Sequence, residues 1–229
     1  MEIHGGFEMN ILIIAPHPDD ETLGVGGVIV KNVKKGNKVY CCVLTKAFPP
    51  QYSEELIVRK REEAEEARRV LGVEKNYYLE LPTLKLDTLP LFDIQQKIMA
   101  VISKCHPEVV YLPHHGDINS DHRVAFEAGI LAAKFTKEST VRNVLSYEVI
   151  CSANWAPPFP ESAFIPNYFE DISGTLAVKM EALKCYRSEM KLAPHPRSLE
   201  LIEIEAKRWG SVIGTEAAEA FILIRGRVV

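Results

Sequence analysis

The sequence has little of what would mark a disulfide-stabilised, membrane-spanning or nucleic-acid-binding protein. Its five cysteines are odd in number and form no C-x-x-C pair, which argues against a disulfide framework or a thiolate zinc site. No apolar run approaches the ~18 residues of a membrane span. The formal net charge of −4 gives no reason to expect nucleic acid or an anionic membrane as a partner. We therefore expect a reducing, cytoplasmic location.

The chain also lacks signs of several domains. There is no internal repeat, low-complexity segment or linker, and 229 residues suffice for one domain with a sizeable core. Residues 1–9 lack a basic segment followed by an apolar one, so no secretory signal is visible and we expect a short extension. We predict a single domain over residues 1–229, in which residues 140–229 elaborate the same fold.

Short apolar runs alternate with helical patterns through the first 134 residues. The expected strands are Ile11–Ala15, Lys38–Thr45, Tyr77–Leu81 and Pro107–Pro113. The expected helices are Val25–Val33, Ser53–Leu71, Leu91–Lys104 and Val124–Lys134. Such alternation predicts right-handed β-α-β crossovers and an α/β fold with a doubly wound, mostly parallel sheet covered by helices on both faces. The later expected elements are strands at Leu145–Ile150 and Phe221–Arg225 and helices at Leu176–Glu189 and Ser198–Trp209.

A polar cluster follows the first buried strand directly. His17, Asp19, Asp20 and Glu21 come immediately after Ile11–Ala15. Ligands bind at the carboxyl ends of strands in open α/β sheets, so an imidazole beside several carboxylates suggests a metal ion. The carboxylates alone are also explained by capping of the following helix, since they complement its dipole.

A second cluster, His114–Arg123, follows the fourth strand and precedes another helix. Neighbouring parallel strands lie ≈ 4.8 Å apart, so the two loops face each other if these strands are adjacent. His17, Asp20 and His122 would then reach one ion. Two imidazoles and a carboxylate leave an open coordination position, which is typical of catalytic zinc. His122 on its own would more often be an ordinary partnered histidine.

The residues of these clusters resemble a known family. Ala15-Pro16-His17-Pro18-Asp19-Asp20-Glu21, with Gly24-Val25-Gly26-Gly27 behind it, resembles the signature of the PIG-L/LmbE-like zinc deacetylases, and Asp117–Arg123 is similar to their second motif. Weaker matches continue through Leu71–Gly72, Phe164–Asn167, Tyr186–Glu189, Pro194–Ser198 and Glu216–Phe221. The resemblance implies a Rossmann-like fold and removal of acetyl groups from N-acetylglucosamine units of glycolipids, thiol glycosides or chitooligosaccharides.

Carried over by position, the resemblance makes His17, Asp20 and His122 the ligands of Zn²⁺, with another divalent metal as the alternative. It makes Asp19 the general base. Asp121, beside His122, is expected to orient an imidazole as part of the catalytic apparatus. Metal-activated water attacks an amide carbonyl in such hydrolases. We expect the glycines after Glu21 to let substrate approach the backbone.

One position departs from the family pattern. Many relatives have histidine where this chain has Asn119, and asparagine can donate a hydrogen bond but cannot deliver a proton. The general acid is then Asp19 after its first transfer, or else a histidine: His195, or the pair His114 and His115.

Substrate contacts are expected from Asp117, Asn119 and Arg197, although Pro194–Ser198 is also readable as a structural turn. Sugar stacking is a possible role of four loop aromatics, which are equally readable as packing residues: Tyr52, Trp155, Phe159 and Tyr168.

The leading hypothesis is a zinc-dependent N-deacetylase whose partner is a small N-acetylated sugar. The alternative is a Rossmann-type nucleotide- or phosphate-binding module without hydrolase activity, in which Gly24, Gly26 and Gly27 hold a phosphate at a helix N-terminus. Against it, the spacing is not G-x-G-x-x-G. A third hypothesis is a metal-bearing scaffold without catalysis. The sequence identifies neither the aglycone nor the oligomeric state, and it is compatible with a homo-oligomer.

Overall fold

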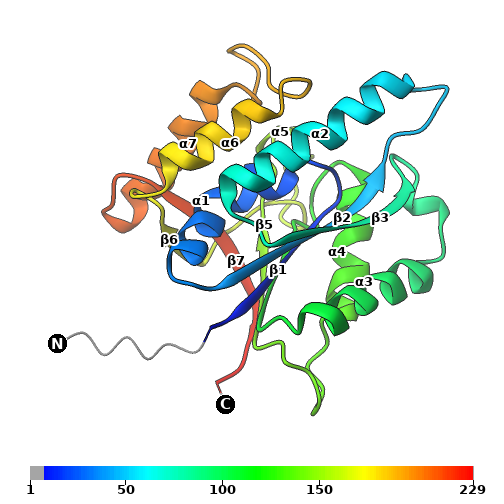
Figure 1. The fold of residues 1–229 in the computed structure, drawn as a ribbon. Helices are drawn as coiled ribbons and strands as arrows, with labels where there is room; N and C mark the ends of the chain where they lie inside the picture. Colours follow the sequence, from blue (N-terminus) through cyan, green and yellow to red (C-terminus); the bar gives the residue numbers. More distant parts are fainter. Residues whose placement is uncertain (1–7, 229) are drawn as a thin grey trace.

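The structure, a computed structural model that describes residues 8–228, has one sheet between two layers of helices (Figure 1). Its strands are β1 (Asn10–Ala15), β2 (Lys38–Lys46), β3 (Lys75–Pro82), β4 (Val109–Pro113), β5 (Asn143–Tyr147), β6 (Tyr168–Asp171) and β7 (Ala218–Gly226). They are ordered β3-β2-β1-β4-β5-β7-β6, and only β7 runs antiparallel to its neighbours. The predicted mostly parallel α/β sheet is confirmed. Residues 1–7 of the expected extension lie outside the described residues.

The helices cover both faces of this sheet. They are α1 (Asp20–Lys34), α2 (Glu54–Leu71), the 3-10 turn η1 (Leu86–Thr88), α3 (Leu91–Cys105), α4 (Ser120–Ala132), α5 (Ile150–Ala153), α6 (Leu176–Cys185) and α7 (Leu199–Ile213). Figure 1 shows α1, α2, α6 and α7 on one side of the sheet and α3 and α4 on the other. The segments after residue 140 add β5, β7 and β6 to the same sheet.

Two helices begin earlier than the sequence pattern predicted. α1 starts at Asp20 rather than at Val25, and α4 starts at Ser120 rather than at Val124. The apolar pattern hid these starts because the first turn of each helix consists of polar residues, which suit the free N–H groups and the dipole there. Asp20 and His122 therefore project from the rigid first turns of helices.

The expectations for the C-terminal part need two corrections. β5 ends at Tyr147, and Ile150 opens the short helix α5 instead of closing a strand. α6 ends at Cys185, so the expected helical stretch to Glu189 is irregular. Helical spacing of apolar residues does not reveal such early stops. The loop between α6 and α7 carries two side chains that belong to the site described below.

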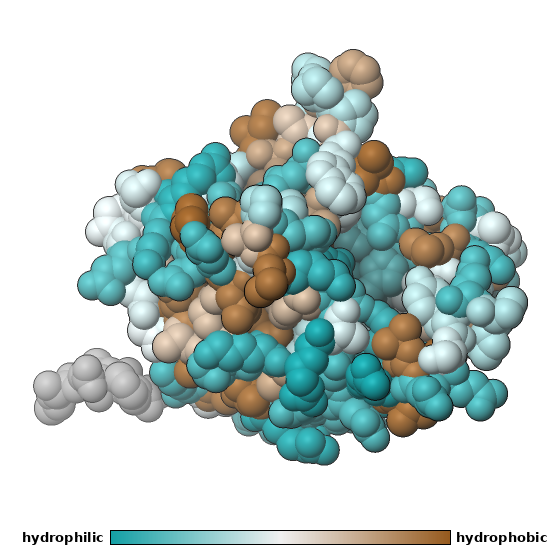
Figure 2. Space-filling model, turned by 90° about the horizontal axis from the view of Figure 1, so that it is seen from above, coloured by the Kyte–Doolittle hydropathy of each residue, from teal (hydrophilic) through white to brown (hydrophobic). Residues whose placement is uncertain are grey.

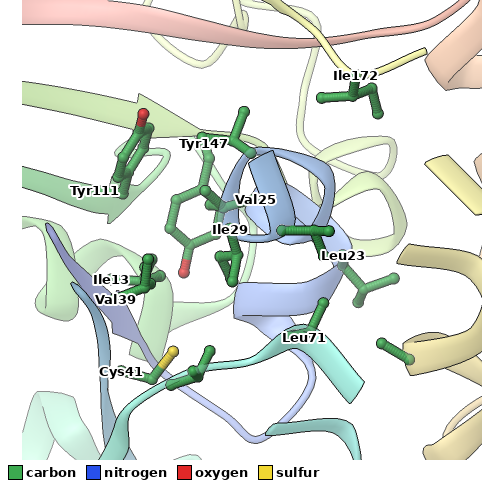
Figure 3. Packing of buried hydrophobic residues seen from close by; sticks show 14 of the residues in the cluster. Ile13, Leu23, Val25, Ile29, Val39, Cys41, Leu71, Tyr111, Tyr147 and Ile172 are labelled. Atoms are coloured by element: carbon green, nitrogen blue, oxygen red, sulfur yellow. The ribbon is translucent and has the colours of Figure 1, made fainter. Parts of the chain in front are cut away.

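Two apolar clusters hold the helix layers to the sheet. One lies between the sheet and helices α3 and α4, and it includes Leu12 of β1, Ile98 of α3 and Leu112 of β4. The other lies under α1, α6 and α7, where Figure 3 shows Tyr147 of the sheet beside Val25 and Ile29 of α1. The Tyr147 hydroxyl donates to the carbonyl oxygen of Ile14 at 2.8 Å, which satisfies its polar group within this core.

A buried ion pair contacts the backbone of α1. Lys179 Nζ lies 2.6 Å from Glu219 Oε1 and donates to the carbonyl oxygen of Leu23 at 2.8 Å. The Glu219 carboxylate accepts hydrogen bonds from the N–H groups of Gly27 and Val28, each at 2.8 Å. The interior of α1 is thereby bonded to α6 and β7.

The glycines of α1 have a packing role. A Cβ atom at Gly24 would lie 2.2 Å from the Tyr147 ring, and one at Gly27 would lie 2.7 Å from Ile172. The expectation that these glycines let substrate approach the backbone is wrong, because core side chains fill the space beside them. The same contacts leave no phosphate cradle at Gly24 or Gly27, which counts against the nucleotide-binding alternative.

The surface seen from above is a mosaic of hydrophilic and hydrophobic residues (Figure 2). Within residues 8–228, no helix combines the length and the apolar character needed to cross a membrane.

Candidate active site

The two polar clusters lie side by side at one edge of the sheet. β1 and β4 are hydrogen-bonded parallel neighbours, with Ile13 opposite Tyr111. The chain leaves both strands at the same edge, and there α1 and α4 begin. The condition set by the sequence argument, that these two strands be adjacent, is therefore met.

His17, Asp20 and His122 converge into a cluster suited to a metal ion. Nδ1 of His17 lies 3.2 Å from Oδ2 of Asp20 and 3.3 Å from Nε2 of His122, and the latter nitrogen lies 3.3 Å from Oδ2 of Asp20. Tetrahedral ligands about 2.0–2.1 Å from zinc are separated from one another by about 3.3–3.4 Å. The three side chains therefore already have the spacing of three ligands of one tetrahedral ion.

The surroundings of the cluster also fit a metal. Among residues 8–228, Oδ1 of Asp20 is one of three buried side-chain nitrogen or oxygen atoms without a hydrogen-bond partner. Asp121 Oδ2 lies 3.1 Å from the outer nitrogen of His17, and Asp117 Oδ2 lies 2.9 Å from the outer nitrogen of His122. Each imidazole is thus oriented by a carboxylate, as metal-ligating histidines usually are.

The charges in the cluster stabilise the Asp20 carboxylate beside a positively charged group. Burial lowers the pKa of His122, but the negative charge of Asp20 and the hydrogen bond with Asp117 outweigh it and raise that pKa to about 10. Burial disfavours the Asp20 carboxylate, yet the positive charge and hydrogen bond of His122 hold its pKa far below the usual range. The carboxylate is therefore matched to a positive charge in its immediate surroundings.

Asp19 lies next to this cluster and faces a cavity. It is buried, and its backbone has a φ of 114°, in a region that L-residues rarely adopt. Its N–H donates to Oε2 of Glu21 at 3.2 Å, and its Oδ2 lies 2.9 Å from Nη1 of Arg197. Burial raises the pKa of Asp19 to about 7, although the positive charge of Arg197 opposes the shift.

The cavity has a volume of about 630 Å³, within the range of small-molecule sites. Its wall includes His17, Asp19, Asn119 and Arg197. Oδ1 of Asn119 accepts a hydrogen bond from the Asp121 N–H at 3.0 Å and so caps α4. With the oxygen used in this way, the side-chain NH₂ group is the part of Asn119 that remains to donate.

Several predicted residues lie elsewhere. Asp117 does not line the cavity: it is buried behind His122, where Ser152 Oγ donates to its Oδ2 at 2.6 Å. His195 is not part of the cavity wall either, and its Nδ1 accepts the Arg197 N–H at 3.0 Å within the loop. His114 is buried with its Nε2 3.0 Å from the carbonyl oxygen of Ser162.

Of the four loop aromatics considered for stacking, the cavity wall contains Tyr52. The wall also contains Glu189, which the sequence did not single out. Glu189 Oε2 lies 2.7 Å from Arg197 Nη1, and its other oxygen pairs with Lys60 of α2. Its membership of the Tyr186–Glu189 match was the one signal available in the sequence.

The mostly parallel sheet makes this an α/β protein. At the ends of two neighbouring strands, two histidines and a carboxylate converge in the arrangement of a metal-binding site. Residues 12–133 match the model of the PIG-L family, described as GlcNAc-PI de-N-acetylase. A diacetylchitobiose deacetylase of Thermococcus kodakarensis is 30% identical over 197 residues, which cover 78% of this chain and 69% of the relative. The chain belongs to the PIG-L family, and this membership makes it a hydrolytic N-deacetylase.

Solved structures share the fold. The N,N'-diacetylchitobiose deacetylase of Pyrococcus horikoshii superposes with a TM-score of 0.76 at 24% identity, covering 95% of this chain and 84% of that one. The 4-carboxy-2-hydroxymuconate hydratase GalB of Pseudomonas putida gives a TM-score of 0.73 at 20% identity, covering 96% and 98% of the two chains. One fold therefore hosts different reactions, so these superpositions show the fold, and the activity class comes from the family match and the deacetylase relative.

Proposed function

We propose that the protein is a zinc-dependent hydrolase that removes the acetyl group from an N-acetylated amino sugar of the N-acetylglucosamine type. The observation that carries the proposal is the convergence of His17, Asp20 and His122 beside Asp19 on the wall of one cavity. The names of the relatives, which are deacetylases of acetylated amino sugars, support the substrate class.

We also assign the fold as Rossmann-like. The parallel strands are ordered β3-β2-β1-β4-β5 in the sheet. From β1 the chain adds strands toward one side of the sheet, and from β4 it adds them toward the other, so the strand order switches between β1 and β4. Ligands bind at such a switch point, outside the carboxyl ends of the strands. The proposed site lies at the ends of these two strands.

His17, Asp20 and His122 would hold the metal ion. When bound there, a divalent metal lowers the pKa of a water molecule and polarises the amide carbonyl as a Lewis acid. The Asp19 carboxylate accepts the proton of the attacking water and then returns it to the leaving amine nitrogen. These two proton transfers need no histidine at position 119, because the Asp19 carboxylate serves in both.

The remaining polar residues position the reacting groups. The side-chain NH₂ of Asn119 donates a hydrogen bond to the developing oxyanion, as oxyanion-hole donors do. Arg197 holds the Asp19 carboxylate in place, and Glu189 holds Arg197. Asp121 and Asp117 keep the imidazoles of His17 and His122 in the orientation for ligation. His195 shapes the loop that carries Arg197, without a proton-transfer role.

The test is a panel of N-acetylated sugars incubated with zinc-loaded protein, with release of free amine as the readout. We expect turnover of N-acetylglucosamine derivatives, loss of turnover after chelation and recovery on addition of Zn²⁺. Reconstitution with Co²⁺ or Mn²⁺ in parallel identifies the effective metal. Stoichiometric zinc without amine release from any of these sugars would favour the scaffold hypothesis instead.

A further inference from the structure

Asp19 and Asp20 are neighbours in the chain, yet their side chains lie in different surroundings. Oδ2 of Asp20 accepts the N–H of His17 at 2.8 Å and belongs to the clustered ligands. Oδ2 of Asp19 instead pairs with Arg197 on the cavity wall. This divergence coincides with a φ of 114° and a ψ of −28° at Asp19, which L-residues rarely adopt. A backbone of this kind persists only where its surroundings hold it in place.

A buried carboxylate contacts this backbone. Glu21 is 5% exposed, and its Oε2 accepts the N–H of Asp19 at 3.2 Å. Its Oε1 accepts hydrogen bonds from two hydroxyl groups, that of Thr22 at 2.6 Å and that of Tyr186 at 2.5 Å. The carbonyl oxygen of Asp19 accepts the N–H groups of Thr22 and Leu23 in the first turn of α1. Both backbone polar groups of Asp19 are therefore held, the N–H by Glu21 and the carbonyl by the helix.

Tyr186 connects the Glu21 carboxylate to the core of the protein. It directly follows the last residue of α6 and is 2% exposed. Its side chain belongs to a small buried cluster with Ala64 and Ala67 of α2 and with Cys185 of α6. The hydroxyl group of a buried tyrosine needs a hydrogen-bond partner, and here Glu21 is that partner. The first turn of α1 is thus bonded to the packing between α2 and α6.

The loop that begins at Tyr186 also reaches Asp19 from a second direction. Glu189 lies in this loop and accepts a hydrogen bond from Arg197 at 2.7 Å. Arg197 in turn donates to the Asp19 carboxylate at 2.9 Å. The loop therefore contacts the side chain of the proposed base through Arg197 and its backbone through Glu21. The first of these contacts is part of the proposed mechanism, and the second has no role in it so far.

We infer that Glu21 and Tyr186 are positioning residues for the general base. The hydrogen bonds from Tyr186 to Glu21 and from the Asp19 N–H to Glu21 keep the backbone in the conformation that turns the Asp19 carboxylate toward the cavity and away from the metal ligands. The inference rests on the proposed function. Neither positioning residue lines the cavity, so their effect reaches the substrate only through Asp19. Their removal should lower kcat and leave KM and zinc binding unchanged.

Two substitutions at position 21 separate the hydrogen bonds from the charge. Glu21→Leu is similar in size but accepts no hydrogen bond, and its kcat should fall about 10²-fold, because a catalytic group displaced by about 1 Å loses that much. Glu21→Gln removes the charge, but its oxygen can still accept the Asp19 N–H, and its NH₂ group can donate to the two hydroxyl oxygens. Glu21→Gln should therefore restore most of the turnover that Glu21→Leu loses. Equal losses in the two variants, or no loss in Glu21→Leu, would overturn the inference.

Tyr186→Phe removes one hydroxyl group, changes the packing little and keeps the inference testable if Glu21→Leu does not fold. Its kcat should fall about tenfold, with KM and stoichiometric zinc retained. Tyr111→Phe is the matched control, because Tyr111 is also 2% exposed and its hydroxyl also donates to a carboxylate, Oε1 of Glu170 at 3.2 Å. Both variants should lose stability to urea, but only Tyr186→Phe should lose turnover. An unchanged kcat in Tyr186→Phe, or the same loss of kcat in both variants, would contradict a positioning role.

A crystal structure of zinc-loaded Glu21→Leu separates this inference from the proposed function. We expect the three metal ligands to keep their places, while Asp19 leaves the region of positive φ and loses its contact with Arg197. This readout needs no turnover, whereas amine release by the unmodified protein tests the proposed function alone. An Asp19 backbone and carboxylate that stay in place in Glu21→Leu would overturn the inference and leave the deacetylase proposal intact.

Discussion

Asp121 Oδ2 lies 3.1 Å from Nε2 of His17, and the same carboxylate also accepts the backbone N–H groups of Leu84 and Leu86. Burial disfavours its charge, but the hydrogen bond from His17 outweighs this and lowers the pKa of Asp121 below its usual value. Replacing it with asparagine removes the charge that orients the imidazole. For Asp121→Asn we expect zinc affinity, measured by competition with a chromophoric chelator, to fall about 10- to 100-fold. Asp93→Asn, on the exposed first turn of α3, should bind zinc normally. An unchanged affinity in Asp121→Asn would show that His17 needs no such support.

Asp19→Asn tests the general base. The substitution keeps the shape of the side chain but cannot accept a proton, so the rate of amine release should fall by about 10²- to 10⁴-fold. Bound zinc should remain, because Asp19 is not among the three clustered ligands. His17→Ala serves as the contrasting variant and should lose the metal together with the activity. Turnover by Asp19→Asn at the normal rate would assign the base to another residue.

Gly24→Ala tests the packing of α1 against the sheet. The added methyl group would lie 2.2 Å from the Tyr147 ring, so the ring or the helix must move within a close-packed core. We expect the free energy of unfolding in urea to fall by about 1–3 kcal/mol. Gly174→Ala is the matched control: a Cβ atom there meets nothing within 4 Å, and its stability should stay within about 0.5 kcal/mol. Equal stabilities of the two variants would contradict this account of the glycine run.

Glu148→Gln tests a carboxylate that lies outside the cavity. Burial, followed by the negative charge of Glu205, raises the pKa of Glu148 to about 7. An acid whose pKa is higher in the folded state than in the unfolded chain takes up a proton on folding between the two values. Its stabilising contribution is therefore complete below the unfolded pKa of about 4.3 and is lost as the pH rises through about 7.

Glutamine cannot ionise, so Glu148→Gln should be insensitive to this loss. The free energy of unfolding of the variant, relative to that of the unmodified protein, should rise by about 2 kcal/mol between pH 5 and pH 8. Urea unfolding at both pH values measures the difference. Glu138→Gln, at an exposed position, controls for the general loss of a negative charge. A difference that does not change with pH would show that Glu148 ionises normally in the folded protein.

The arrangement of the sheet was predictable because its strands are short apolar runs that end at proline or at polar clusters. Ile11–Ala15 and Pro107–Pro113 show this pattern, and the observed β1 and β4 agree with it. The helix starts were less predictable, since Asp20 and Ser120 lie in polar first turns without apolar spacing. The two imidazoles and the carboxylate of the cluster were identifiable because each follows one of these strands.

Other features depend on contacts that no local pattern encodes. Glu80 resembles an ordinary exposed strand residue in the sequence, and only the bulge in β3 and the pairing with Lys46 place it in the cavity wall. His195 stood between two prolines and suggested chemistry, yet its hydrogen bond serves the loop. Lys179 lies in an unremarkable stretch, and Glu219 stood out only as part of the Glu216–Phe221 match. Their pairing becomes visible only when α6 and β7 meet beneath α1.

The pairing of Lys179 with Glu219 limits how far the chain can be truncated from its C-terminal side. The family match ends at residue 133, before either partner occurs. A fragment restricted to the matched residues would leave the N–H groups of Gly27 and Val28 and the carbonyl of Leu23 without these buried partners. These groups belong to α1, the helix whose first residue is Asp20. Minimal versions of the protein for engineering should therefore retain the final strand, since the helix that presents the aspartate is anchored by the far end of the polypeptide.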